Sequence, residues 1–499
     1  MKRSTNQPLE RGQRITGTFE VESGRTVFGE LAIEGEQTSL YLRDDDFFLT
    51  LDLEQGYLAG TAHDLSRLSL HQCITQSGPG TGWRGPESYT FAELFPHYIL
   101  HGSAHLRPDE RCVAAISFSV EDGRAAFYDF DSYGLVLEPQ KLIEKVANAN
   151  RAVIKRKVVT GPNPQIRYFA GRTDLLDADT AIGTVLVKNR TGLSLPGAEA
   201  IVPGVGFEIV FEEPVTFEAA QDRATTLTRF LNLIIGRPQN RKDLVVKTAK
   251  EADPAPHFLR AYATLQDRWD HGPDRGPGPR DVLIEGVSNR REMQKVLQRW
   301  LALNPVRRDA RLRFALGFEQ RHRFSEDRLI GAANMFDLLP ADAVPRRVRL
   351  TKNVLAARDQ AKALFKALDD CPERQAILGA LGRVGQSSLR QKIGHRAKIV
   401  TRRLPWLAPD MDLVIREAVN CRNHYVHGSA ASFDYRGSGA FAFLTRALEF
   451  IFGASDLVDC GWNLRRFAAN GGDHPFALLL QSWPNEVAAI KAEMAKGRA

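Results

Sequence analysis

A short string near the C-terminal end combines residue types that can break a phosphodiester bond without a metal ion. Arg422 and Asn423 stand side by side, His427 follows the asparagine by four positions, and Gly428 comes directly after the histidine. An arginine is a permanent cation, and a histidine changes its protonation state near neutral pH. With the amide of Asn423, these groups could stabilise a developing phosphorane and move protons. The string therefore predicts acid–base chemistry on a phosphate-bearing substrate.

The residues before this string predict the helix that carries it. Apolar residues at positions 411, 414, 415, 418 and 419 follow the helical repeat. Pro409 and Asp410 are typical of a helix start. We therefore expect one helix to run from about residue 409 into the string.

The end of that helix would bring the candidate residues together. Asn423 and His427 are four positions apart and share one helix face. Arg422 lies about 100° away from Asn423 on the helix, but its long side chain can reach the same site. Gly428 is expected to end the helix in a left-handed conformation. His427 would then lie in the last turn, where the helix dipole favours the protonated imidazole.

The spacing of arginine and histidine is not sufficient evidence by itself. Arg390 and His395 are separated by the same five positions, but no asparagine follows Arg390. An alternative interpretation is that Arg422 and His424 lie in solvent while His427 only caps the helix. The chemistry is therefore assigned to the Arg-Asn pair together with the histidine, and Arg390 and His395 serve as a comparison pair.

The charge of the chain is unevenly distributed. The net charge is +7, but residues 1–240 hold 24 Lys and Arg against 31 Asp and Glu. Residues 241–499 hold 43 basic residues against 29 acidic ones. A basic C-terminal half is typical of a nucleic-acid partner, although it could also dock onto the acidic half.

The first half of the chain reads as strands. Apolar residues alternate in segments 15–21, 27–33 and 207–211, and Ser23-Gly24 is predicted to turn the chain between the first two. Segment 116–127 is predicted as a hairpin around Asp122-Gly123. A helix bearing Leu227, Phe230, Leu231 and Ile234 is expected after Pro214, ended by Gly236 and Pro238. The expected class is α+β, with a β-rich domain over residues 1–250 and a linker with a connecting helix over 251–299.

The second half, 300–499, reads as helices. A Pro- and Gly-rich stretch at 271–279 precedes it and is predicted to contain no helix or strand. Helical repeats then occur at 312–316, 329–336, 350–368 and 441–451. The apolar stretch 441–458 contains three charged residues, so a buried helix is expected and not a membrane span. Five scattered cysteines and the polar residues 1–7 favour a cytosolic protein without a secretory signal.

Two candidate metal sites are set aside. Cys421, His424 and His427 have a Cys-x-x-His-x-x-His spacing, but positions i, i+3 and i+6 spread around a helix. The histidines at 97, 101 and 105 lie in a segment that reads as a strand edge, where a structural role is expected. Gly204-Val205-Gly206 lacks the setting of a phosphate-binding loop. No cofactor or metal is expected.

The Arg-Asn-x-x-x-His string resembles the motif of HEPN nucleases, and segment 300–462 resembles the HEPN region of ApeA-like anti-phage proteins. Residues 1–250 are similar in organisation to the ApeA N-terminal domain. The resemblance implies an all-α HEPN-type bundle, with Arg422, Asn423 and His427 as catalytic or site-forming residues. His424 is an addition within the variable triplet, and His424 and Arg416 are expected to contact RNA.

The resemblance further implies a cytoplasmic, metal-independent endoribonuclease of anti-phage defence that acts as a toxin in abortive infection. RNA would be cleaved by attack of its own 2′-hydroxyl, with transfer RNA as one plausible target. A homodimer through the helical domain is implied, with a phage-derived trigger acting on the N-terminal domain. One alternative is a non-catalytic HEPN protein that binds RNA or a nucleotide. Another is a β-domain enzyme or ligand binder whose helices only dimerise.

Overall fold

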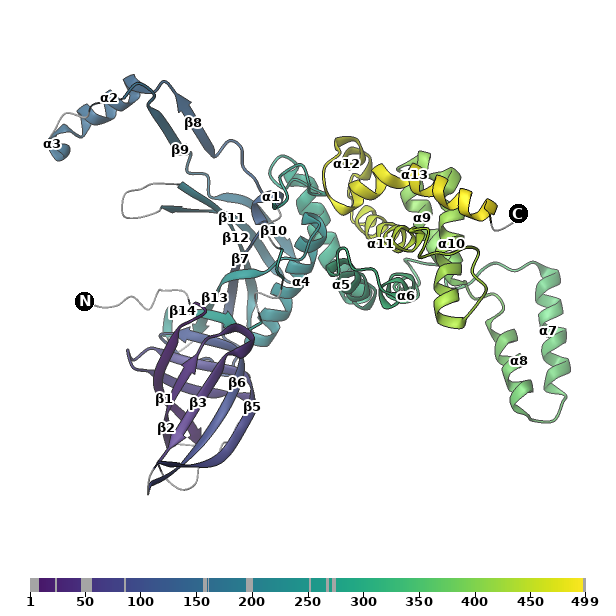
Figure 1. Cartoon of the computed structure of the whole chain (residues 1–499), viewed down its shortest axis with the longest axis horizontal. Coiled ribbons are helices and arrows are strands. Elements are labelled where there is room, and N and C mark those ends of the chain that lie inside the picture. The colour runs from purple at the N-terminus through teal and green to yellow at the C-terminus, as the bar shows by residue number, and fades with distance from the viewer. Residues whose placement is uncertain are drawn as a thin grey trace. The chain divides into compact units, whose positions relative to one another are not determined.

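The computed structural model describes residues 9–22, 25–45, 56–84, 87–155, 159, 161–193, 201–250, 253–265, 269–271 and 275–496. The chain forms two compact units, Met1–Gln298 and Arg299–Ala499. The first unit is rich in strands and the second is helical, which confirms the α+β class (Figure 1). The predicted turn at Ser23-Gly24 and part of the Pro- and Gly-rich stretch, 272–274, lie outside the described residues.

Six strands of the first unit form a closed antiparallel sheet. Their order is β6-β3-β2-β1-β4-β5, and β5 pairs again with β6. This confirms the two strands predicted from the first alternating segments. The strands are β1 (Arg14–Glu22), β2 (Arg25–Ala32), β3 (Ser39–Asp44), β4 (Leu58–Ala62), β5 (Arg67–Arg84) and β6 (Glu87–Gly102).

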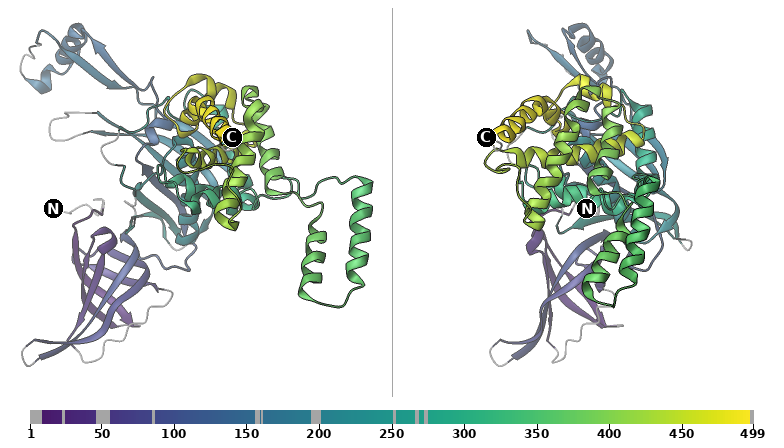
Figure 2. Two further views of the ribbon diagram at one scale, coloured as in Figure 1. Left: turned by 45° about the vertical axis from the view of Figure 1, so that its right-hand side comes forward. Right: turned by 90° about the vertical axis from the view of Figure 1, so that its right-hand side faces the viewer.

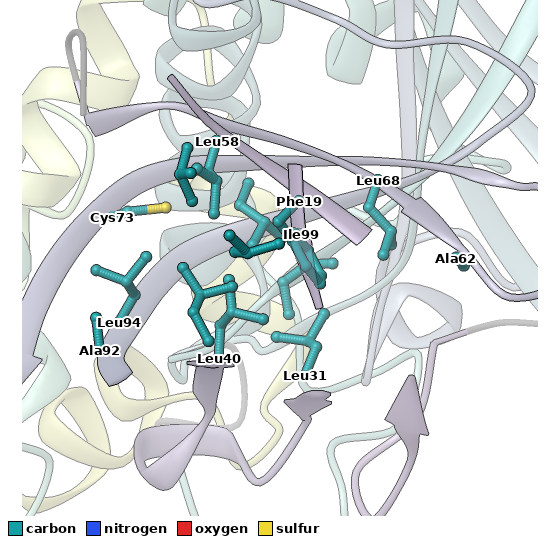
Figure 3. Packing of buried hydrophobic residues seen from close by; sticks show 14 of the residues in the cluster. Phe19, Leu31, Leu40, Leu58, Ala62, Leu68, Cys73, Ala92, Leu94 and Ile99 are labelled. Atoms are coloured by element: carbon teal, nitrogen blue, oxygen red, sulfur yellow. The ribbon is translucent and has the colours of Figure 1, made fainter. Parts of the chain in front are cut away.

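Inward-facing apolar side chains fill the closed sheet (Figure 3). Phe19, Leu31, Leu40 and Ile99 are completely buried there. The ring of Phe19 occupies space that Gly60 leaves open, because a Cβ atom at Gly60 would come within 2.6 Å of that ring. The alternation that predicted these strands therefore reflects one face packed into a common core.

An open antiparallel sheet continues from the same strand β6. Its order from β6 is β14-β13-β7-β12-β11-β10. Segment 251–299, expected as a linker with a connecting helix, contributes β14 to this sheet and the first turns of α5. The strands are β7 (Val113–Val120), β10 (Asp174–Thr180), β11 (Gly183–Leu193), β12 (Ile201–Val215), β13 (Arg241–Lys250) and β14 (Asp253–Ala263).

Pro96 marks the point at which β6 changes partner. Residues 90–94 of β6 pair with β3, whereas residues 98–101 pair with β14. A proline lacks the N–H that a sheet ladder needs, so it is tolerated where the ladder on one edge is interrupted. Closed and open sheets therefore share one strand, and Pro96 lies at their junction.

Helix α4 (Phe217–Ile235) confirms the helix predicted after Pro214, and it packs against β7 and β12. Thr216 caps its start, and Gly236 ends it in the left-handed conformation. A separate two-stranded ribbon and short helices complete the described parts of the first unit. They are η1 (Gly35–Gln37), α1 (Gly123–Ala126), β8 (Tyr133–Leu137), α2 (Gln140–Ala149), α3 (Arg151–Ile154) and β9 (Gln165–Phe169).

The predicted hairpin around Asp122-Gly123 is wrong. Strand β7 pairs with β12 and β13, and the chain after Asp122 forms the short helix α1. The Asp122 carboxylate accepts two hydrogen bonds of 2.6 Å from the guanidinium of Arg237. Phe127, which was predicted to continue a strand, is instead buried with its ring against Phe207. A distant ion pair thus overrides the local turn preference.

The second unit is a bundle around α11, of which nearly every side chain is buried. The expectation of a buried helix over 441–458 is confirmed, and no helix among the described residues is long and apolar enough to cross a membrane. The helices are α5 (Arg290–Glu319), α6 (Glu326–Asn334), α7 (Lys352–Lys366), α8 (Pro372–Arg383), α9 (Leu389–Thr401), η3 (Pro405–Leu407), α10 (Ala408–His427), α11 (Ala440–Asp459), α12 (Leu464–Asn470) and α13 (Pro475–Lys496).

Buried ion pairs hold other helices to α11. Arg328 of α6 donates to both carboxylate oxygens of Glu449, at 2.7 and 2.8 Å. Arg311 of α5 donates to Asp456, at 2.9 Å. Burial alone would raise the pKa of Asp456, but Arg311 and Arg307 outweigh it, and the pKa lies below its usual range.

Helices α7 and α8 form a hairpin that stands away from the rest of the bundle in Figure 1 and in the left view of Figure 2. Neither helix has a buried residue, and Leu364 and Leu368 are 71% and 57% exposed. Backbone hydrogen bonds from Val348 to Gly385 and from Ser387 to Arg346 join the two legs at the base. The helical repeat at 350–368 was predicted correctly, but its apolar stripe does not enter the core.

Candidate active site

The helix predicted to carry the candidate residues is α10. It starts at Ala408 with Pro409 in its first turn and ends at His427. Gly428 follows at φ 65°, the left-handed conformation expected for the cap, and its N–H donates to the His424 carbonyl. Met411, Val414 and Ile415 of the apolar stripe are buried. The stripe fixes the rotation of α10, which leaves the other face of its last turns accessible.

Arg422, Asn423 and His427 lie in direct contact. The Arg422 Nη1 atom is 3.1 Å from Asn423 Oδ1 and 3.0 Å from His427 Nε2. Arg422 and Asn423 are half-buried, whereas His427 is exposed. The long arginine side chain therefore bridges the helical step that separates it from the other two residues.

The contact between Arg422 and His427 defines the protonation of the imidazole in this arrangement. A guanidinium can only donate, so Nε2 must accept and its proton must be absent. The ring hydrogen is then on Nδ1, as inferred from the hydrogen bond. The imidazole of His427 is therefore neutral in this arrangement, whereas the helix dipole alone would favour the protonated imidazolium. A neutral imidazole with an available lone pair is the form needed in a general base.

Arg422 has a further donor without a protein acceptor. Its Nε atom is buried and has no hydrogen-bond partner in the part of the chain that the structure describes. An unsatisfied buried donor costs free energy, on the order of 1–3 kcal/mol. A phosphate oxygen could satisfy it, because guanidinium groups bind phosphates through parallel N–H donors.

His424 and Arg416, expected to contact RNA, already have protein partners. His424 Nδ1 lies 2.8 Å from the Ser429 carbonyl oxygen, so this ring nitrogen is the donor and Nε2 is left to other partners. Arg416 Nε donates to Glu417 Oε1 at 2.9 Å, and 37% of its side chain is exposed. In the part of the chain that the structure describes, neither residue forms a hydrogen bond with the triad of Arg422, Asn423 and His427.

Glu417 was missed by the sequence reasoning. Its carboxylate is completely buried, and it accepts from Arg416 and, at 3.3 Å, from the hydroxyl of Tyr435. Burial, with Glu417 nearby, raises the pKa of Tyr435 to about 12, so the phenol stays a donor. Tyr435 lies beyond the loop that follows Gly428, so this contact anchors the loop to α10. A carboxylate three residues after Val414, on the buried face, was the available signal.

The comparison pair Arg390 and His395 is arranged differently. Arg390 Nη2 donates to both carboxylate oxygens of Asp412, at 3.0 and 2.8 Å. The pKa of His395 is lowered mainly by burial and further by the positive charge of the neighbouring Arg396. The same sequence spacing therefore gives a surface ion pair here, and the Arg–Asn–His contact is particular to α10.

Cys421, His424 and His427 are not gathered around a common point. The Cys421 thiol is completely buried, and burial raises its pKa to about 12, so it remains a neutral thiol. His427, in contrast, is exposed. Among the described residues, no cluster of His, Cys, Asp and Glu side chains could hold a metal ion. His101 and His105 hydrogen-bond to Ser66 and to the Leu68 carbonyl of the closed sheet.

Comparison with protein families gives two matches in the order of the two units. The family ApeA N-terminal domain 1 matches residues 14–300, more than half of the chain. The chain belongs to the ApeA family. The family Apea-like HEPN matches residues 330–466, which include the whole of α10. No curated protein and no solved structure is significantly similar to the chain.

Membership of the ApeA family narrows the range of functions. HEPN domains are often ribonucleases, and this combination of domains suggests a ribonuclease or nucleotide-binding role in defence. The resemblance inferred from the Arg-Asn-x-x-x-His string is thereby confirmed at the level of the family.

Proposed function

We propose that this ApeA-family chain is a metal-independent endoribonuclease of anti-phage defence, with its active site at the end of α10. The contact of Arg422 with both Asn423 and His427 carries the proposal. It joins a permanent cation, an amide and an imidazole that can accept a proton. The unsatisfied Nε of Arg422 offers a donor for the scissile phosphate.

The reaction uses the 2′-hydroxyl of the RNA as the nucleophile. His427 Nε2 takes the proton of the 2′-hydroxyl, the O2′–P bond forms, and the P–O5′ bond breaks. Arg422 stabilises the charge on the non-bridging oxygens, and Asn423 orients the guanidinium through its Oδ1 atom. The products are a 2′,3′-cyclic phosphate and a 5′-hydroxyl end. Arg422 must release Nε2 when RNA binds, because the same lone pair accepts the substrate proton.

The leaving O5′ atom needs a proton from a second group. The imidazole of His427 becomes charged only after it has taken the 2′-hydroxyl proton, so it cannot act as acid and base at the same moment. A second copy of the chain, as the family implies, would bring another His427 to the same phosphate. The proposed enzyme is therefore a homodimer through the helical unit.

Electrostatic attraction supports RNA as the substrate of the basic half. Residues 241–499 hold 43 basic against 29 acidic residues. His424 Nε2 and the exposed part of Arg416 extend the polar surface near the triad and are proposed to contact the RNA backbone. Binding should weaken steeply as the salt concentration rises, because Lys and Arg contacts release counterions. Transfer RNA is the first candidate substrate.

The proposed biological role is abortive infection. The enzyme would act as a cytoplasmic toxin that stops phage growth by cutting cellular RNA. The first unit would restrain the helical unit until a phage-derived trigger acts on it. The acidic balance of residues 1–240 is compatible with such restraint of a basic partner.

The decisive experiment compares wild type with His427→Ala in cells, followed by mapping of RNA ends. The proposal predicts new 5′-hydroxyl and cyclic-phosphate ends with wild type only. The variant His395→Ala is the matched control and should cut as wild type does. A wild type that is toxic without producing such ends would contradict the nuclease function.

A non-catalytic HEPN domain that binds RNA or a nucleotide is the second candidate. One observation favours it: Arg422 already engages the Nε2 lone pair of His427. If this contact persisted in the RNA complex, the imidazole could not accept the 2′-hydroxyl proton. Salt-dependent RNA binding by wild type, without cleavage under any condition that activates the cell response, would support this candidate.

A further inference from the structure

The first unit contains a cavity of about 650 Å³ that is far in sequence from the HEPN motif. The end of β7, the turn after it, β11, β12 and the start of β13 line this cavity, together with residues 269–271. All of these segments belong to one compact unit. Four cationic side chains line it, Arg124, Arg190, Arg237 and Lys242, and so do three carboxylates, Glu121, Asp243 and Asp270.

Two of the four cations are neutralised within the protein. Arg237 makes a bidentate pair with Asp122, and both side chains are only 10% exposed. Lys242 Nζ lies 3.0 Å from Glu121 Oε1. The Arg237–Asp122 and Lys242–Glu121 pairs fix the shape of the cavity wall and contribute little net charge to it.

The other two cations are not neutralised. In the described parts of the chain, no carboxylate forms an ion pair with Arg124 or Arg190. The Arg124 guanidinium lies 5.2 Å from the centre of the Tyr128 ring, a contact that leaves its charge uncompensated. Both arginines are exposed at the cavity and can accept an anionic partner.

Gly206 provides the space that Arg190 occupies. A Cβ atom at position 206 would lie 2.0 Å from Arg190 Nε and 2.6 Å from its Cζ. The arginine side chain therefore lies flat across the glycine, which holds the guanidinium at the wall of the cavity. This explains one glycine of the Gly204-Val205-Gly206 string, which is not part of a phosphate-binding loop.

We propose that this cavity binds the phosphate group of a small molecule through Arg124 and Arg190. A guanidinium binds phosphate through two parallel N–H donors. A lysine ammonium, which acts as a point charge, cannot supply this geometry. The cavity volume is within the range of about 300–1,000 Å³ typical of small-molecule sites. Inorganic phosphate would fill only a small part of the cavity. The remaining space is lined in part by Trp269 and suits a nucleoside-sized group.

Binding to the full-length protein tests the proposal. Calorimetry and thermal shift would use AMP, adenosine and inorganic phosphate as probes, with wild type and four variants. The proposal predicts that AMP binds and that adenosine, which lacks the phosphate, does not. AMP binding more tightly than inorganic phosphate would show that the nucleoside contacts the cavity. Equal affinity of the two would assign the site to the phosphate alone, which still supports the proposal.

The variants separate this cavity from other basic surfaces. Arg190→Ala should weaken AMP binding by about tenfold or more, the loss expected for a charge-assisted hydrogen bond. Gly206→Ala keeps the arginine but displaces it, so it should also weaken binding. Arg167→Ala, at an exposed arginine on β9 outside the cavity, and Arg390→Ala, at an exposed arginine of the second unit, should bind as wild type does.

Two results would overturn the proposal. One is equal AMP affinity in wild type and Arg190→Ala, with the unliganded Tm of the variant close to that of wild type. The other is the absence of any shift with AMP and with inorganic phosphate at millimolar concentrations. If Arg190→Ala did not fold, the conservative Arg190→Lys would replace it, since it keeps the charge but loses the parallel donors. Unchanged AMP affinity in Arg190→Lys and Gly206→Ala would then overturn the proposal.

Discussion

The contact between Arg422 and His427 predicts that the two residues act as one unit. Removal of His427 by H427A should reduce the rate of RNA cleavage by about 10²–10⁴-fold, the usual contribution of a general base. Arg422→Ala should reduce it by about 10²–10³-fold, the usual loss for one charge-stabilising donor. Arg422→Lys should recover only part of this loss, because an ammonium cannot reproduce the two contacts at 3.0 and 3.1 Å.

The double variant is the sharper measurement. If the residues acted independently, the losses would multiply to about 10⁴-fold or more. Because Arg422 and His427 act on the same scissile phosphate in the proposed reaction, we expect the double variant to lose about as much as the more severe single variant. The assay is single-turnover cleavage of end-labelled RNA by full-length protein, with circular dichroism to confirm folding.

The comparison pair supplies the control. Arg390→Ala breaks an exposed ion pair with Asp412. His395→Ala removes a histidine that, among the described residues, is not hydrogen-bonded to Arg390. Both variants should retain cleavage. Losses that multiply in the Arg422 and His427 double variant, or equal losses at the comparison pair, would refute the assignment of the triad.

Four further outcomes are expected. Cleavage by the triad should persist in EDTA and stop when the cut site carries a deoxyribose, as measured on labelled RNA; loss in EDTA with recovery on added Mg²⁺ would contradict the mechanism. Burial lowers the pKa of His71 to about 4, opposed by its contact with the Leu106 carbonyl, so His71 stays neutral in the fold. The unfolded histidine titrates near 6.5, so stability should fall between about pH 6.5 and 4, by about 3 kcal/mol at pH 4; denaturation of His71→Phe should lack this slope, whereas exposed His63→Gln should keep it. Glu449→Ala should cost about 3–5 kcal/mol in denaturant, because it leaves Arg328 buried and unpaired; joint replacement of both residues by Met should cost less. Gly428→Ala should cost about 1 kcal/mol, since its φ of 65° strains any other residue while its Cβ would meet open space; a neutral effect would show that the helix end relaxes.

Local patterns in the sequence predicted the elements, because periodicity depends on neighbouring residues. The apolar stripe of α10 and the cap at Gly428 defined the helix and the end at which Arg422, Asn423 and His427 meet. The strands of the closed sheet followed from simple alternation. The direct contact of Arg422 with His427 could not be predicted, because it depends on the rotamer of a long side chain.

Features that depend on distant residues were not predictable. The turn at Asp122 is decided by Arg237, which is 115 positions away in the chain. The pairings of β1 with β4 and of β3 with β6, which complete the closed sheet, and the strand order of the open sheet have no local signal. The apolar stripe that includes Leu364 and Leu368 was recognised from its periodicity, but its exposure was not. Periodicity identifies an apolar face but not what covers it.

Strand β6 makes the first unit difficult to divide. One edge of β6 pairs with β3 before Pro96 and with β14 after it, while the other edge pairs with β5 over its whole length. A fragment ending at residue 250 would lack β14 (Asp253–Ala263), so half of that edge of β6 and one edge of β13 would lose their ladder partner. Such exposed edges promote aggregation. In amide hydrogen exchange, both sheets should open together with β6 among the slowest segments, since a strand shared by two sheets cannot be released from either one alone.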